Sequence, residues 1–123
     1  MIGKAYVSIL KFYDNRNHRM AFKKRLVLIV GKADSSDYVV LPISRVTNRE
    51  NLDDYYDVPI EPSEVPLMNL TQCSYVRTHK QSVVHIGELV QEIVDFKKEY
   101  YEIYFDVISK MEQFQKSIID NAL

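Results

Sequence analysis

The sequence predicts an α+β fold that is mainly β, because the spacing of apolar residues changes along the chain. The first two-thirds holds short β-branched or aromatic runs separated by turn residues, a pattern typical of antiparallel strands. From Leu89 onward apolar residues recur every three or four positions, the period of an amphipathic helix. The 123 residues fit one domain, since domains typically span about 100–200 residues. We therefore expect one domain over residues 1–123, β-rich over about 1–88 and helical over about 89–120.

Two apolar runs, Ala5–Leu10 and Arg25–Val30, predict the first two strands, and the second run is apolar on both faces, as central strands are. The turn cluster Gly31–Asp37 is expected to return the chain antiparallel into a third strand, Tyr38–Ser44. Pro42 has no N–H to donate, so it indicates a bulge, a strand end or a locally exposed edge. Three shorter strands are expected further on: a possible one at Tyr55–Val58, then Leu70–Val76 and Ser82–Ile86.

Two segments flank this predicted sheet. Residues 11–24 are rich in Lys, Arg and Asn and predict a long basic loop between the first two strands. Long loops on compact domains are usually functional or disordered. No Pro or Gly follows Gly87, so the C-terminal helix either splits in two or projects past the sheet. Its apolar stripe packs on its own barrel or, in the distal turns, on a partner or a second copy.

Composition excludes several classes of protein. Cys73 is the only cysteine, so an internal disulfide and a zinc cluster are excluded, and a reducing, cytoplasmic setting is expected. The N-terminus lacks the basic and apolar segments of a signal peptide, and no stretch has about 18 uncharged apolar residues, so we expect no membrane association.

Charge is segregated along the chain although the net formal charge is −1. Residues 1–49 hold ten Lys and Arg against three Asp, whereas residues 50–70 hold six acids and no Lys or Arg. An N-terminal half this basic would attract a polyanion. The alternative is that these charges only coat a solvated surface.

No motif for a metal or a nucleotide cofactor occurs, so we expect neither. His18, His79 and His85 do not share helical ligand spacing, and the three glycines form no phosphate-binding loop. What remains is a set of cations and hydroxyls near predicted strand ends: His18, Arg19, Lys23, Lys24, Arg25, Ser44, Arg45, Ser74, Arg77, Thr78, His79 and Lys80.

This set of side chains suits RNA cleavage without metal. That reaction needs a group that takes the 2′-hydroxyl proton, a group that protonates the leaving 5′-oxygen, and cations that stabilise the charged phosphorane. Each residue also has a structural alternative. Arg25 could pair with an acid, and a serine at a strand end often satisfies a local backbone group.

The order of the predicted elements resembles the PemK/MazF family of toxin endoribonucleases over roughly residues 1–90. The opening strand Gly3–Ile9 and the run Arg25–Val30 look like the family's first two strands, the second of which starts at an arginine. Val39–Ser44 resembles the strand that ends in a Thr or Ser. Ser74–Thr78 resembles the later segment with an apolar–Arg–Thr core, and Ile86–Leu89 matches the Ile-Gly-x-Leu before the C-terminal helix.

The resemblance implies a small SH3-like antiparallel barrel with a long C-terminal helix. It also implies a homodimer that acts as the toxin of a type II toxin–antitoxin system and cuts single-stranded RNA, such as mRNA, at short sequences. Cleavage in the family needs no metal and leaves a 2′,3′-cyclic phosphate and a 5′-hydroxyl. A cognate antitoxin protein inhibits by laying an acidic tail across the RNA groove.

By the same resemblance Arg25 and Ser44 are the expected catalytic residues, and His18 is a possible acid–base group whose residue type titrates near neutrality. We expect six further residues to bind RNA: Arg19, Lys23, Lys24, Arg45, Arg77 and His79. Tyr13 and Phe22 are candidates for stacking on unpaired bases, or for core packing.

The sequence departs from the family pattern at Leu26, where Pro is usual, in the missing glycine before Arg25, and in the length of the helix. The missing Pro and the long helix favour a second hypothesis, a non-catalytic SH3-like module that binds RNA or a protein and acts as a regulator. The presence of Arg25, Ser44 and Arg77 together favours the enzyme. A third, a purely structural dimerisation protein built on residues 89–120, leaves the basic segment unexplained.

Overall fold

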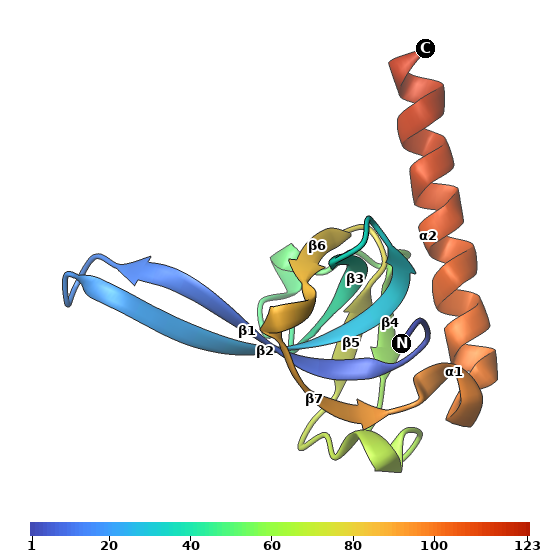
Figure 1. Ribbon diagram of the computed structural model, residues 1–123. Coiled ribbons are helices and arrows are strands. Elements are labelled where there is room, and N and C mark those ends of the chain that lie inside the picture. The colour runs from blue at the N-terminus through green and yellow to red at the C-terminus, as the bar shows by residue number, and fades with distance from the viewer.

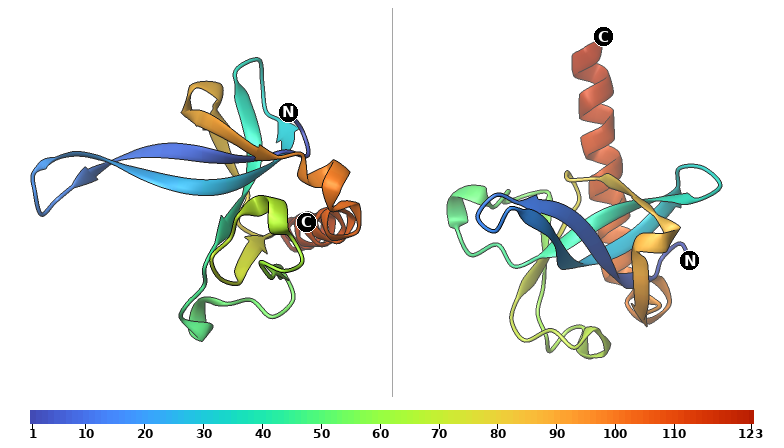
Figure 2. Two further views of the ribbon diagram at one scale, coloured as in Figure 1. Left: turned by 90° about the horizontal axis from the view of Figure 1, so that it is seen from below. Right: turned by 60° about the vertical axis from the view of Figure 1, so that its left-hand side comes forward.

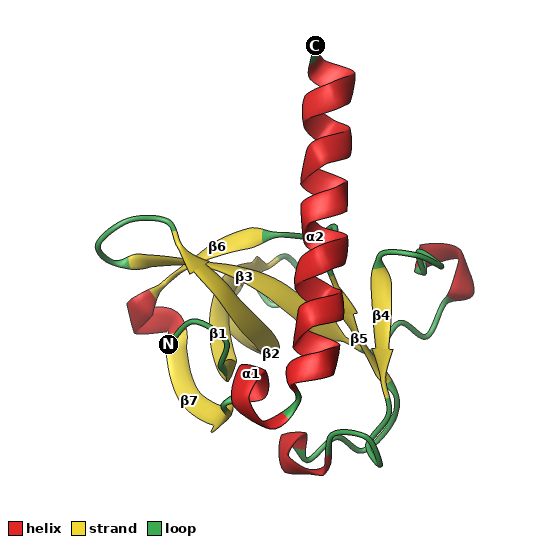
Figure 3. Cartoon of the chain, turned by 90° about the vertical axis from the view of Figure 1, so that its right-hand side faces the viewer, coloured by secondary structure: helices red, strands yellow, loops and turns green.

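The computed structural model describes residues 1–123 and has the predicted fold class, α+β and mainly β (Figure 1). A curled antiparallel sheet forms a half-barrel, and one long helix stands beside it at the C-terminus (Figures 1 and 3). The elements in chain order are β1 Ala5–Asp14, β2 Arg19–Lys32, β3 Asp37–Ser44, the 3-10 turn η1 Arg49–Asn51, β4 Asp57–Ile60, η2 Pro66–Met68, β5 Ser74–Arg77, β6 Ser82–His85, η3 Ile86–Glu88, β7 Leu89–Val94, α1 Phe96–Glu99 and α2 Tyr101–Ala122.

Strand β3 is the hub of the sheet, whose order is β4-β5-β3-β2-β1-β7 with β6 paired to β3. One edge of β3 pairs with β2 along most of its length. The other edge is shared, because β6 pairs with Asp37–Val40 and β5 with Ile43 and Ser44. Pro42 lies at the break between these two partners, so the locally exposed edge that its missing N–H requires is present.

Residues 11–24 do not form the predicted basic loop. They continue β1 and β2 into a two-stranded arm that projects from the body, paired as far as Asp14 and Arg19 (Figures 1 and 2). The Asp14 carboxylate closes the turn by accepting hydrogen bonds from the backbone N–H groups of Arg16, at 2.9 Å, and Asn17, at 3.4 Å. Most residues of the arm are exposed, so neither face is buried against the body and the apolar–polar alternation of a half-buried strand is missing here.

The C-terminal region differs from prediction at its start. Residues Leu89–Val94 are strand β7, which pairs antiparallel with β1 from Ser8 to Ala5, and the helices begin only at Phe96. A short apolar run suits a strand or a helix, and here the free edge of β1 decides the outcome. From Tyr101 the predicted helix is present and runs past the sheet in Figure 1. No helix combines the length and the hydropathy needed to cross a membrane.

The main core lies between the sheet and the helices. Phe96, Tyr104 and Val107 from α1 and α2 pack with Leu28 of β2 and Leu41 of β3 among 13 buried residues. The opposite face of β2 and β3 buries a smaller apolar cluster of Val27, Ile29 and Val40. The apolar side chains in the N-terminal half of α2 therefore pack on the protein's own sheet, which is one of the two alternatives predicted.

Gly3 fastens the N-terminus to α1. Its N–H donates to the Ile29 carbonyl at 2.7 Å, and its carbonyl accepts from the Lys97 N–H at 2.8 Å. Its φ is +90°, a region that side chains disfavour, and an added Cβ would lie 2.7 Å from the Lys97 Cβ. Only glycine therefore fits without a shift of the backbone.

Gly3→Ala should lower the free energy of unfolding by about 1–3 kcal/mol, since both strain and a backbone-proximal clash are introduced. Gly31→Ala is the matched control, because its added Cβ meets Val39 only at an ordinary 3.7 Å. It should change stability by less than about 1 kcal/mol. Urea denaturation followed by circular dichroism measures both variants, and equal effects would contradict the assignment.

Candidate functional site

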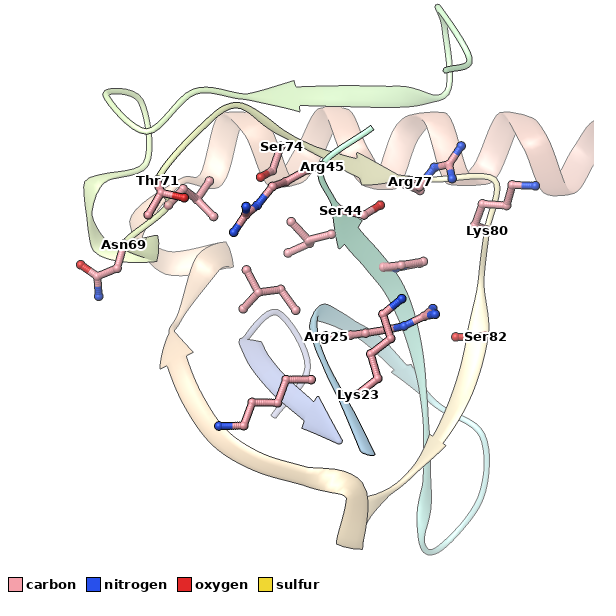
Figure 4. Close-up of a pocket in the computed structure, with 15 residues that line it drawn as sticks. Lys23, Arg25, Ser44, Arg45, Asn69, Thr71, Ser74, Arg77, Lys80 and Ser82 are labelled. Atoms are coloured by element: carbon pink, nitrogen blue, oxygen red, sulfur yellow. The ribbon is translucent and has the colours of Figure 1, made fainter. Parts of the chain in front are cut away.

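A groove of about 750 Å³ opens where β2, the end of β3 and β5 converge (Figure 4). The β2 residues 23–26 form one side, and the β3 residues 42–44 with Arg45 directly after them lie next to this side. The loop that follows η2 and the turn between β5 and β6 complete the lining. The lining residues are Lys23, Lys24, Arg25, Leu26, Pro42, Ile43, Ser44, Arg45, Asn69, Leu70, Thr71, Ser74, Arg77, Lys80 and Ser82.

The lining is strongly positive. Six of the 15 residues are Lys or Arg, four carry hydroxyl groups, and none is Asp, Glu or His. Cations gathered in a concave site focus their field and raise the local concentration of anions. Planar guanidinium groups and hydroxyls are also suitable donors to phosphate oxygens. The groove is therefore chemically suited to a phosphodiester backbone.

The register between β2 and β3 places Arg25 next to Ser44. Leu26 lies opposite Ile43, so the next position along the two antiparallel strands brings Arg25 and Ser44 to one face. Arg25 is exposed and Ser44 is half-buried, and both line the groove. In Figure 4 Arg25 and Lys23 extend from β2 toward the side of the groove that holds Ser82. The two residues predicted to be catalytic are thus cross-strand neighbours.

Five of the six groove cations have no acidic partner. Lys23, Lys24, Arg25, Arg45 and Lys80 take part in none of the ion pairs of the structure, and their side chains form no hydrogen bond. Four of these five were predicted site residues, the exception being Lys80. Unpaired cations retain their full attraction for an anionic ligand, since no internal carboxylate competes for them.

Arg77 lines the groove, but its guanidinium group is bonded to residues of the protein itself. Its Nε donates to the Asp57 carboxylate at 3.0 Å, and its Nη2 donates to the Asn51 carbonyl at 2.7 Å. The Asp57 side chain is fully buried, so this ion pair fastens β4 to β5 inside the protein. Breaking a buried pair strands an uncompensated charge. Arg77 therefore has a structural role that its predicted RNA contact did not include.

His79 is not among the groove-lining residues, so its RNA-binding role stays a prediction without support from the groove. Its side chain is 12% exposed and packs against Tyr56 and Phe114, with ring centroids 6.0 Å away in each case. Its Nδ1 is buried without a hydrogen bond and lies 3.8 Å from the Asp57 carboxylate. Burial lowers the pKa of His79, although the charges of Asp57 and Asp53 oppose this shift.

His18 and Arg19 lie at the tip of the arm, which projects from the body in Figure 1, and neither residue lines the groove. His18 adopts a left-handed backbone conformation, with φ of +52°, and is exposed in the turn. A role for His18 as an acid or base would require the arm to fold over the groove, so it stays a prediction. Along the arm, Tyr13 and Phe22 are 54% and 64% exposed and are free to stack on a ligand.

Four lining residues carried no signal in the sequence. Asn69, Leu70 and Thr71 follow η2, and the left-handed Asn69 directs this loop back toward β5. Ser82 starts β6, opposite Val40. These residues reach the groove through the path of the chain after η2 and β5, which no local motif encodes. No cluster of three His, Cys, Asp or Glu side chains that could hold a metal is present.

Stability should fall as the pH is lowered through the range below about 6.5, the ordinary pKa of histidine. His79 resists protonation in the folded protein, so the unfolded chain binds more protons there and acid favours unfolding. Asp57, Asp53, Arg77 and Lys80 act on this imidazole. Urea midpoints between pH 7.5 and 5.5 should fall less for His79→Gln than for the wild type. Parallel pH curves would contradict the assignment.

Comparisons with known proteins do not identify a family for this chain. A scan against protein-family models gives no match, and a search of curated proteins gives no match either. The functional interpretation therefore depends on the groove itself and on the resemblance in motif order.

Proposed function

We propose that the protein is a metal-independent, sequence-specific endoribonuclease that cleaves single-stranded RNA. The observation that carries this proposal is the groove, in which Arg25 and Ser44 lie side by side among unpaired cations, with no carboxylate in the lining. The motif order that resembles the PemK/MazF family supports the same reaction. It also supports a role as the toxin of a type II toxin–antitoxin system.

The proposed chemistry is transesterification by the RNA itself. The 2′-oxygen attacks the neighbouring phosphorus and loses its proton, the bond from phosphorus to the 5′-oxygen breaks, and that oxygen gains a proton. The products are a 2′,3′-cyclic phosphate and a 5′-hydroxyl. An arginine guanidinium keeps its positive charge, so Arg25 is suited to stabilise the extra charge of the phosphorane. Ser44 is suited to orient the phosphate or the 2′-hydroxyl.

A second candidate is a non-catalytic module that binds RNA or a protein partner. One observation favours it: the groove contains no imidazole and no carboxylate, the groups that most often transfer protons in enzymes. A binder needs only cations and stacking surfaces, which the groove and the arm supply. Substitution of one groove residue separates the two functions, because an enzyme loses turnover steeply while a binder loses affinity gradually.

The proposed ligand is single-stranded RNA that runs from the groove along the arm. Lys11, Arg19, Lys23 and Lys24 would follow its backbone, and Tyr13 and Phe22 would stack on its bases. The proposed protein partners are an acidic antitoxin, which would compete for the same cations, and a second copy in a homodimer. We place the protein in the cytoplasm.

Arg25→Ala should reduce RNA cleavage in EDTA by at least about 100-fold, because one preorganised donor to the transition state is lost. The matched control is Lys32→Ala, an exposed cation of the same strand outside the groove, which should cleave as the wild type does. Fragments of a long single-stranded RNA are separated on gels, and their ends are mapped. Discrete cuts with 5′-hydroxyl ends are expected.

Ser44→Ala should lose less activity than Arg25→Ala, since a hydroxyl orients the substrate but is a weak base unaided. If the folded wild type binds RNA and leaves it intact, the endoribonuclease proposal fails and the binding module replaces it. Activity retained by Arg25→Ala would remove Arg25 from the site.

Binding should weaken steeply with salt because it releases counterions from the RNA. For single strands the slope of log affinity against log salt is about −0.7 for each phosphate neutralised. Lys23→Gln combined with Lys24→Gln should therefore make this slope less negative by about 1.4. Lys116→Gln, an exposed cation on α2, should leave the slope unchanged. Fluorescence anisotropy of a labelled 12-nucleotide RNA measures each slope, and a slope unaltered in the double variant would exclude those lysines.

A further inference from the structure

Two residues of α2, Phe114 and Gln115, contact the chain segments that form one wall of the groove, on the side away from its opening. The Phe114 ring packs edge-on against Tyr56 at 5.1 Å and against His79 at 6.0 Å between ring centroids. One residue further, the Gln115 side-chain amide donates to the Gln81 side-chain oxygen at 2.6 Å. Both His79 and Gln81 belong to the turn between β5 and β6. Figure 4 shows the helix running behind this part of the groove.

That turn has little support of its own. Strand β5 ends at Arg77 and β6 begins at Ser82, so residues 78–81 pair with no strand. Inside the turn, the Lys80 N–H donates to the Arg77 carbonyl at 3.2 Å. The Thr78 hydroxyl and N–H both donate to the Tyr56 carbonyl, at 2.7 and 3.2 Å. Tyr56 packs on Phe114 and on Tyr55, and its N–H donates to Asp53 at 2.7 Å. The side-chain contacts that support residues 79 and 81 of the turn therefore include two residues of α2, Phe114 and Gln115.

The front of the same turn belongs to the groove. Arg77, Lys80 and Ser82 are lining residues, and Lys80 is one of the cations without an acidic partner. The turn therefore presents charge on one side and rests on Phe114 on the other. A long exposed Lys side chain gains affinity for a polyanion only where its backbone is held, since ordering it on binding costs entropy.

We propose that α2 braces the groove, with Phe114 as a positioning residue that fixes the turn at residues 78–81 for binding of the polyanion. This inference rests on the proposed function for the identity of the ligand. Phe114 touches no substrate, because it lies behind the wall. It acts through His79 and Tyr56, so its loss should impair binding of RNA more than the cleavage step at Arg25 and Ser44.

Phe114→Ala should raise the KM for RNA cleavage about tenfold, within the range seen for residues that couple to a site indirectly, and change kcat less than about twofold. The matched control is Ile118→Ala, one turn further along α2 and 52% exposed, which should change neither constant. Phe114→Tyr keeps the ring and should restore the wild-type KM. Loss of kcat at constant KM in Phe114→Ala, or failure of the Tyr variant to restore KM, would overturn the proposal.

A second measurement needs no RNA and so separates this proposal from the proposed function. Amide hydrogen exchange of Thr78 and Lys80 should become at least about tenfold faster in Phe114→Ala, while Leu28 and Leu41 in the core keep wild-type rates. If Phe114→Ala does not fold, Gln115→Ala removes only the contact with Gln81 and should accelerate the Lys80 amide to a smaller extent. Unchanged exchange at both amides would overturn the brace even if RNA is cleaved. Faster exchange without any RNA cleavage would support the brace and count only against the endoribonuclease.

Discussion

The antiparallel pairing of β2 with β3 sets the geometry of the core and of the groove together. Leu28 lies opposite Leu41 and Leu26 opposite Ile43, which directs one row of side chains toward the helices. The next position brings Arg25 beside Ser44. A slip of one residue in either strand would turn its row of side chains away from the main core and toward the opposite face. The free energy of core burial therefore also fixes the register on which the candidate site depends.

The segregation of charge along the sequence persists in space. The acidic segment after β3 does not neutralise the groove, because its buried carboxylate, Asp57, is already paired with Arg77. Asp53 accepts the backbone N–H groups of Tyr55 and Tyr56 at 2.9 and 2.7 Å, which lowers its pKa and keeps it turned toward its own loop. The five groove cations other than Arg77 thus repel one another without a paired carboxylate. A polyanion bound there would relieve this repulsion. Part of its binding free energy would therefore come from the repulsion already present in the free protein.

The parts of the fold that the sequence predicts are those with a strong local pattern. The all-apolar run at residues 26–30 and the turn cluster after it identify the central hairpin, and Arg25 and Ser44 follow as its polar ends. Other features depend on distant partners. Residues 11–24 are strand because β1 and β2 pair with each other, and residues 89–94 are strand because the edge of β1 is free. His79 has the residue type of an RNA ligand, yet the packing of Phe114 against it withdraws it from the groove.

The contacts of Phe114 and Gln115 give the C-terminal turns of the long helix α2 a structural role. The side chains of α2 that pack on the main core extend as far as Met111, and a helix ending there would satisfy that core. The following turns reach Phe114, where they contact the two loops that flank the Asp57–Arg77 ion pair. That ion pair orients an arginine of the groove, and the His79 ring, which packs on Phe114, lies 3.8 Å from the same Asp57 carboxylate. The helix therefore connects the hydrophobic core with the electrostatics of the groove, two features that the sheet alone would leave independent.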